Sequence, residues 1–225
     1  QGNTGIGRSA LLVSTGDNNT AIGYLALKEN TSGSKNTAVG YNASGGVSTG
    51  VNNTSIGAEA TNYNYSNSTA IGYQAGVSGD NQVQLGNFQT TTYAWGAIQN
   101  RSDARDKVDV RNTKLGLDFI LTLRPVDYKY NYRDSYRVIN PDGTETYLLN
   151  DGSKTQKEYK HGFIAQEVKK IMEEKKLEFG GLNDLNKTGG KDILYIGYTE
   201  FIAPMVKAIQ EQNIIIEAQK SRIET

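Results

Sequence analysis

The sequence predicts a mainly β trimeric shaft of parallel β-roll or solenoid repeats, followed by an α+β domain that ends in a long coiled-coil helix. Three observations predict this fold class. A short motif repeats between residues 3 and 87, the charged residues gather after residue 100, and isoleucines recur every seven residues near the C-terminal end. We therefore expect a repeat shaft over residues 1–92, a junction over 93–101 and a second domain over 102–225, with the coiled coil at about 200–225.

The repeated motif is Asn-Thr-Ala-Ile-Gly with small variations. Five copies lie in order along the chain, and a degenerate sixth follows. Their closing glycines are Gly7, Gly23, Gly40, Gly57, Gly72 and Gly86, which lie 16, 17, 17, 15 and 14 residues apart. Turn-forming clusters separate the copies, so each copy predicts one short β-strand in one coil of a solenoid.

Each coil offers one branched apolar residue, which cannot form a core by itself. Stacked coils would line these residues into one interior ladder of Ile6, Ile22, Val39, Ile56, Ile71 and Leu85. The glycine after each of them would permit a tight corner, or the close approach of a neighbouring chain. So thin a solenoid favours oligomerisation, most simply as a homotrimer.

The repeat resembles the head of trimeric autotransporter adhesins, where such units form a left-handed parallel β-roll within a trimer. Tyrosines follow three of the closing glycines, at Tyr24, Tyr41 and Tyr73. They could form a sugar-binding stripe outside the shaft or pack between coils or chains, because tyrosine suits both roles.

Composition excludes several classes of function. Lys plus Arg and Asp plus Glu both total 24, so no net charge attracts nucleic acid or an anionic membrane. The absence of cysteine and the single histidine exclude disulfides, thiolate metal clusters and an all-imidazole zinc site within one chain. No apolar run approaches the ~20 residues of a membrane helix. We expect no cofactor, metal, nucleic-acid partner or membrane insertion, and we expect the chain to begin inside a longer protein.

After residue 101 the pattern predicts ordinary mixed structure. We expect helices over 112–123 and 164–176, a strand over 126–130, and a hairpin of 136–139 with 144–149 around a turn at 140–143. At the C-terminal end the heptad is Ile202, Ile209, Ile216 and Ile223. Its second seam position holds Met205, Gln212 and Gln219, so the pattern is compatible with a trimeric coiled coil, and an amphipathic helix packed on its own chain is the alternative.

Three ordered blocks carry a second resemblance, at residues 100–107, 117–128 and 161–168. Together with the terminal heptad they resemble the intramolecular chaperone auto-processing domain that follows endosialidases and phage tailspikes. The resemblance spans residues 100–225. It implies a domain that trimerises, guides folding of the upstream β-structure and then cuts itself off beside the serine of a Ser-x-x-x-x-Lys dyad. Ser102, as nucleophile, and Lys107, as general base, occupy those positions.

The chemistry of such a dyad is demanding. A serine hydroxyl is a weak nucleophile until a base takes its proton, and a neutral lysine can be that base. Lysine ordinarily titrates near ~10.4, so the amine must be desolvated or lie beside other cations. Burial on trimer formation would supply this and would couple cleavage to assembly. The two side chains can meet only if the residues between them turn.

The cleavage site would include Arg101, Ser102 and Asp103, with the cut on either side of the serine. Other polar residues of the blocks could support the site or serve only structure. These candidates are Asp106, His161, Gln166 and Glu167, and Arg105 shares with Asp103 and Asp106 the alternative of a solvated charged loop.

The resemblance also implies a setting. The chain would belong to a virion as a tail fibre or tailspike, with the chaperone part acting in the host cytoplasm during assembly before it is shed. The upstream fibre would bind a host-cell receptor or glycan. The main alternative is a non-cleaving trimerisation module of an adhesin or receptor-binding fibre. A membrane-tethered transcription factor using the same domain is disfavoured by the adhesin-like shaft.

Overall fold

We analysed a computed structural model of the chain, which describes residues 2–46, 49–139, 145–188, 190 and 192–224. Contacts divide the chain into two compact units. The first comprises Gln1–Ala97, Arg137–Leu148 and Leu185–Ile193, and the second comprises Ile98–Tyr136, Leu149–Asp184 and Leu194–Thr225. The chain forms a parallel β-solenoid, then a small α+β region, then a C-terminal helix, which confirms this part of the predicted fold class.

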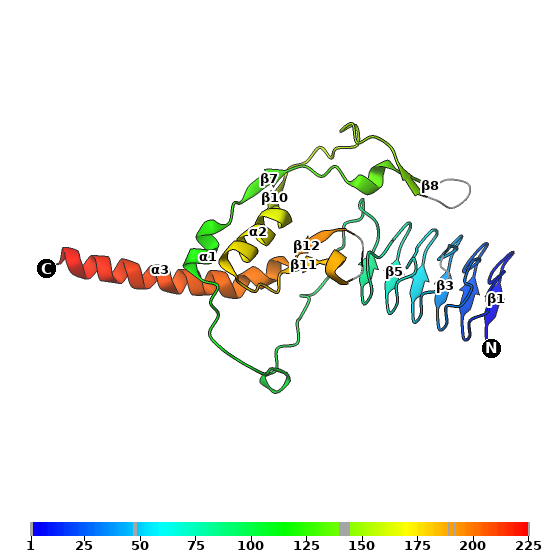
Figure 1. Cartoon of the computed structure of the whole chain (residues 1–225), viewed down its shortest axis with the longest axis horizontal. Helices are drawn as coiled ribbons and strands as arrows, with labels where there is room; N and C mark the ends of the chain where they lie inside the picture. The colour runs from blue at the N-terminus through cyan, green and yellow to red at the C-terminus, as the bar shows by residue number, and fades with distance from the viewer. Residues whose placement is uncertain (1, 47–48, 140–144, 189, 191, 225) are drawn as a thin grey trace. The chain divides into compact units, whose positions relative to one another are not determined.

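The solenoid is built from one short strand per repeat. Its six strands pair in chain order and in parallel, so that equivalent repeat positions lie side by side, for example Ala21 opposite Ala38 (Figure 1). The strands are β1 (Thr4–Ile6), β2 (Thr20–Ile22), β3 (Thr37–Val39), β4 (Thr54–Ile56), β5 (Thr69–Ile71) and β6 (Val83–Leu85).

The predicted interior ladder of isoleucines is wrong for the single chain. Successive side chains of a strand point to opposite faces, so in β2 to β5 the middle residue faces inward and the branched residue faces the other way. Inside are Ala21, Ala38, Ser55 and Ala70, all at most 1% exposed. The narrow coil holds alanine, whereas Ile22, Ile56 and Ile71 remain 39–43% exposed.

Asparagine side chains hold the coils together from within. Asn36 is buried, its Nδ2 donates to the Gly50 carbonyl oxygen over 2.7 Å, and its Oδ1 accepts from the Asn53 N–H of the next coil over 3.0 Å. The same pair of bonds recurs at Asn19 and Asn53. This Asn ladder explains why asparagine opens the first four copies of the motif, since it satisfies backbone groups that would otherwise be buried without a partner.

The closing glycines permit the tight stacking of coils. At Gly40 φ is +136°, and an added Cβ would lie 2.6 Å from the Gly57 carbonyl oxygen of the next coil. The close approach therefore comes from the next coil of the same chain. Tyr24 and Tyr41 stack between coils with ring centroids 5.7 Å apart, as one of the two predictions for the tyrosines had it, while both remain exposed.

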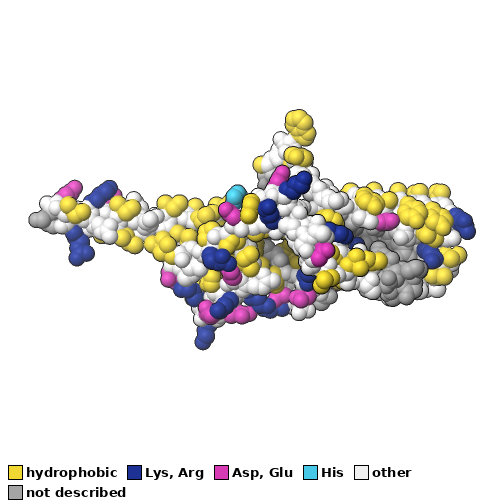
Figure 2. All heavy atoms as spheres, turned by 90° about the horizontal axis from the view of Figure 1, so that it is seen from above, with side chains coloured by type: hydrophobic (Ala, Val, Ile, Leu, Met, Phe, Trp, Pro, Cys, Tyr) yellow, Lys and Arg dark blue, Asp and Glu magenta, His cyan; other side chains and the backbone are white. Residues whose placement is uncertain are grey.

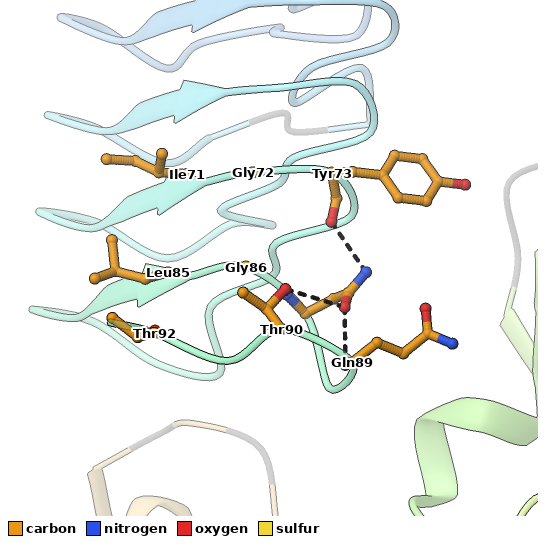
Figure 3. A pocket seen from close by; sticks show the side chains of 9 residues that line it. Ile71, Gly72, Tyr73, Leu85, Gly86, Gln89, Thr90 and Thr92 are labelled. Atoms are coloured by element: carbon orange, nitrogen blue, oxygen red, sulfur yellow. Dashed lines mark hydrogen bonds between the residues drawn. The ribbon is translucent and has the colours of Figure 1, made fainter. Parts of the chain in front are cut away.

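The last coil ends in a polar turn. Asn87 Nδ2 donates to the Tyr73 carbonyl oxygen over 3.2 Å, and Asn87 Oδ1 accepts from the Gln89 N–H over 2.9 Å. Figure 3 shows this turn and, beside it, Ile71 and Leu85 one above the other on the outer face of β5 and β6. These residues line a hollow of about 500 Å³.

The remaining elements are short. The hairpin strands β8 (Arg137–Ile139) and β9 (Glu145–Tyr147) pair as predicted, and the expected turn at 140–143 lies outside the described residues. Two more antiparallel pairs join β7 (Val126–Tyr128) to β10 (Lys160–Gly162) and β11 (Leu182–Asp184) to β12 (Leu194–Ile196). The 3₁₀ helices are η1 (Ala104–Asp106), η2 (Arg133–Tyr136), η3 (Leu185–Thr188) and η4 (Tyr198–Phe201).

Three α-helices form the core of the second unit, α1 (Leu117–Thr122), α2 (Ala165–Lys175) and α3 (Ile202–Ile223). Phe119, Val168, Met172, Phe179 and Phe201 pack together with Leu115 in its apolar cluster. Helix α1 starts five residues later than predicted, because Gly116 interrupts the pattern at its N-terminus. The predicted strand over 126–130 ends at Tyr128.

Helix α3 presents two different faces. Pro204 and Ala208 are buried, and α1 packs against this helix. The heptad isoleucines Ile202, Ile209, Ile216 and Ile223 are 41–84% exposed, so the helix packs on its own chain, as the alternative prediction had it, through a different face. Figure 2 shows hydrophobic side chains along this helix. In the described part of the chain no helix is long and apolar enough to cross a membrane.

Candidate self-cleavage site

The candidate dyad lies on a short turn. Residues 104–106 form η1, which the Asp103 side chain caps by accepting the Arg105 N–H over 2.9 Å. The Asp106 N–H donates to the Asp103 carbonyl oxygen and the Lys107 N–H to that of Ala104, each over 3.1 Å. The segment therefore turns in the way that a contact between Ser102 and Lys107 requires.

The turn brings the two candidate side chains together. Lys107 Nζ donates to Ser102 Oγ over 2.6 Å, and both residues are exposed. The same contact serves a neutral amine with the roles reversed, the hydroxyl then donating to the nitrogen. The pair thus has the hydrogen bond that nucleophile and base need.

Two ion pairs flank the dyad. Arg105 binds the Asp103 carboxylate with Nε at 3.0 Å and Nη2 at 2.6 Å. These hydrogen bonds lower the pKa of Asp103 and raise the pKa of Arg105. Arg101 binds Asp106, with Nε 2.6 Å from Oδ2 and Nη2 3.0 Å from Oδ1. The four charged residues are thus paired with one another while their side chains remain open to water.

The other candidates have partners elsewhere in the second unit. His161 Nδ1 lies 2.6 Å from Asp127 Oδ1 on the neighbouring strand β7. Glu167 on α2 forms a bidentate ion pair with Arg124. The hydrogen bond from the Arg124 side chain lowers the pKa of Glu167. Gln166 is exposed on α2. None of these recorded contacts includes Ser102 or Lys107, and the contact of Glu167 joins the second block of the sequence to the third.

Sequence reasoning missed Glu211. Its Oε2 accepts the N–H of Leu117 at the start of α1 over 2.7 Å, and its Oε1 lies 2.8 Å from Lys207 Nζ. Gly116 makes room for this contact, since an added Cβ would lie 2.2 Å from Glu211 Oε2. Glu211 stands 94 residues from Leu117, so only an alignment or a structure could connect them. It fastens the helix that follows the dyad segment to α3.

Residues 102–177 match the model of the Peptidase_S74 family, described as chaperone of endosialidase. This segment of the chain is therefore similar to the chaperone of endosialidase. The family is one of self-cleaving peptidases whose domain serves as an intramolecular chaperone, and the match begins at Ser102, the candidate nucleophile. No curated protein matches the chain. Within the described residues no group of three or more His, Cys, Asp or Glu side chains is placed to hold a metal ion.

Proposed function

We propose that the chaperone-of-endosialidase domain folds an upstream fibre and then releases itself in a single turnover by cutting the chain beside Ser102. The observation that carries the proposal is the 2.6 Å contact between Lys107 Nζ and Ser102 Oγ. It lies at the first residue of the segment that matches the self-cleaving family. The proposal is supported by geometry, because the nucleophile lies within hydrogen-bond distance of its base.

The proposed reaction is an acyl shift followed by hydrolysis. Ser102 Oγ bonds to the Arg101 carbonyl carbon as its proton passes to neutral Lys107 Nζ. The Arg101–Ser102 C–N bond then breaks, and Lys107 returns the proton to the departing Ser102 nitrogen. Water hydrolyses the resulting ester, which leaves a carboxylate on Arg101 and restores the Ser102 hydroxyl. Atoms and protons balance without any cofactor.

We further propose that the chain acts as a homotrimer. Two sets of exposed branched side chains support this, one on the roll and one on α3. The roll set is Ile6, Ile22, Ile56, Ile71 and Leu85, and the helix set is Ile202, Ile209, Ile216 and Ile223. Contiguous apolar surface of this kind is typical of an interface, and a heptad of isoleucine suits a coiled coil.

Assembly would also control the chemistry. Ser102 and Lys107 are exposed in the single chain, where water surrounds both reacting groups. A neighbouring subunit that covers the turn would remove this water and favour the neutral amine. Cleavage would then follow assembly, and the released fibre would be trapped kinetically in its folded state.

The proposed setting is a viral tail fibre or tailspike. The roll would form the end of the fibre shaft within the virion, and the domain would act in the host cytoplasm and be shed. Binding of a host-cell receptor or glycan would belong to the upstream fibre. The adhesin-like repeat and the family match support this setting.

A denaturing gel of the freshly expressed chain tests the proposal. The wild type should yield fragments of residues 1–101 and 102–225, while Ser102→Ala and Lys107→Ala should stay whole. Lys114→Ala, which removes another exposed lysine of the same segment, is the matched control and should cleave normally. A wild-type chain that is folded, trimeric and uncut would contradict self-cleavage and favour the non-cleaving trimerisation module.

A further inference from the structure

Arg101, the residue before Ser102, also has a partner on the other side of η1. The Arg101 guanidinium forms a bidentate ion pair with the Asp106 carboxylate across η1. Its Nε lies 2.6 Å from Oδ2 and its Nη2 lies 3.0 Å from Oδ1. Paired bonds of this kind fix the orientation of both side chains, which a single bond to lysine would not do. The backbone at Arg101 is therefore tied to the far end of the turn.

The two contacts across the turn have the same spacing along the sequence. Arg101 pairs with Asp106 and Ser102 pairs with Lys107, and each partner lies five residues further along the chain. Between them Asp103 caps η1 and binds Arg105, so the turn is fixed by its own hydrogen bonds. The residues on both sides of the Arg101–Ser102 bond are thus anchored to one short element.

We propose that Asp106 is a positioning residue that selects the Arg101–Ser102 bond for cleavage, by holding the Arg101 side chain. This inference rests on the proposed self-cleavage and adds which bond is cut and what presents it. Holding the Arg101 side chain would restrict the backbone beside Ser102 and so present the Arg101 carbonyl carbon to Ser102 Oγ. The bond that breaks is the C–N bond between these two residues, as in the acyl shift described above.

Loss of the ion pair between Arg101 and Asp106 should change the rate of cleavage and not the stability of the fold. Arg101 is 82% exposed and Asp106 42% exposed, and an ion pair this open to water contributes little to folding. Fixing the reacting groups in place, in contrast, changes rates strongly, because a misplacement of about 1 Å can slow a reaction about 100-fold. Loss of Asp106 should therefore slow cleavage while the fold and the trimer persist.

The experiment follows cleavage of the full chain over time after refolding, with the oligomeric state measured on the same samples. Asp106→Asn and Arg101→Gln should each slow cleavage about 10- to 100-fold, and the reversed pair Arg101→Asp with Asp106→Arg should recover much of the rate. Molar salt should slow the wild type and leave Asp106→Asn unaffected, because salt screens exposed charges.

Asp109→Asn is the matched control. It removes an exposed carboxylate that lies 4.0 Å from Arg111 on the same segment, away from the scissile bond, and it should cleave at the wild-type rate. Asn also suits the positive φ of +53° at this position.

Three results would overturn the inference. One is Asp106→Asn cleaving the same bond at the wild-type rate, and another is slow cleavage that accompanies loss of the trimer, which would make the ion pair structural. The third is a cut at the Ser102–Asp103 bond in the wild type. These results differ from failure of the proposed function, in which the wild type is not cut at all and the inference falls with it.

Discussion

At the scale of single residues, the contact between Ser102 and Lys107 exists because η1 turns the chain back on itself. Any long cation at position 107 could reach the serine hydroxyl, and only one that can lose its proton near neutral pH can act as its base. Arginine keeps its proton throughout this range. Replacing Lys107 by arginine therefore tests whether Lys107 has a structural role or acts as a base.

Lys107→Arg should therefore abolish cleavage while the fold persists. We expect the rate to fall by at least about 100-fold, the usual contribution of a general base. A time course on denaturing gels, with circular dichroism as a check on folding, measures this. Cleavage by the arginine variant at near the wild-type rate would rule out Lys107 as the base.

The Asn ladder carries a second residue-scale prediction. Asn36→Ala would leave the Gly50 carbonyl and the Asn53 N–H buried without their partner, at a cost of about 2–4 kcal/mol in unfolding free energy. Glu29→Ala, an exposed position of the same roll, should cost less than about 0.5 kcal/mol. Denaturant unfolding of the two variants gives the comparison, and equal midpoints would show that the ladder does not stabilise the coils.

The local sequence pattern could predict only some of the contacts that these residues make. The five-residue spacing and the family blocks predicted Ser102 and Lys107 as partners, because both lie on one turn. The ion pair between Arg101 and Asp106 was not predicted, because the direction of a side chain on a turn depends on its dihedral angles. The partnership of His161 with Asp127 depended on a strand pairing of unknown register.

At the scale of elements, the repeats predicted the strands of the roll and misplaced their inner face. Both faces of a three-residue strand fit the pattern Thr-Ala-Ile, and hydrophobicity alone favoured the isoleucine as interior. The structure places the small middle residue inside, as at Ala38, and leaves the isoleucine partly exposed. The start of α1 was also predicted too early, since Gly116 and the contact of Glu211 define it.

Glu211 gives an element-scale prediction about pH. Hydrogen bonds from Lys207 and from the Leu117 N–H lower its pKa below the ordinary 4.5. Because the folded pKa is lower than the unfolded one, the carboxylate stabilises the fold above about pH 4.5, and this contribution is lost as pH falls through the lowered pKa. Glu211→Gln should therefore lower the Tm of the full chain near neutral pH, and its difference from the wild type should shrink between about pH 5 and pH 3.

Glu217→Gln is the control for this measurement. Glu217 pairs with Lys220 on the same helix over 2.8 Å, and its recorded bond does not involve α1. Its Tm should stay close to that of the wild type at each pH. A difference between Glu211→Gln and the wild type that stays constant from neutral to acid pH would contradict the role of the Glu211 carboxylate.

At the scale of the whole molecule, the exposed isoleucines of α3 are the surface through which we propose that assembly precedes cleavage. Ile209→Asp with Ile216→Asp would place charges on the heptad seam, so sedimentation should report monomer and the denaturing gel should report an uncut chain. Ile214→Asp changes an isoleucine outside the heptad that is about as exposed as Ile209, and it serves as the control. A doubly substituted chain that is monomeric and still cuts itself would separate cleavage from assembly.

The most direct test of self-cleavage is the intact mass of the fragments from freshly assembled wild-type chain, with Ser102→Ala treated in parallel. We predict a shaft fragment that ends at Arg101 and a domain fragment that begins at Ser102, with the alanine variant whole. A folded trimer in which every wild-type chain keeps its full mass would contradict self-cleavage, and a domain fragment that begins at Asp103 would contradict attack on the Arg101 carbonyl.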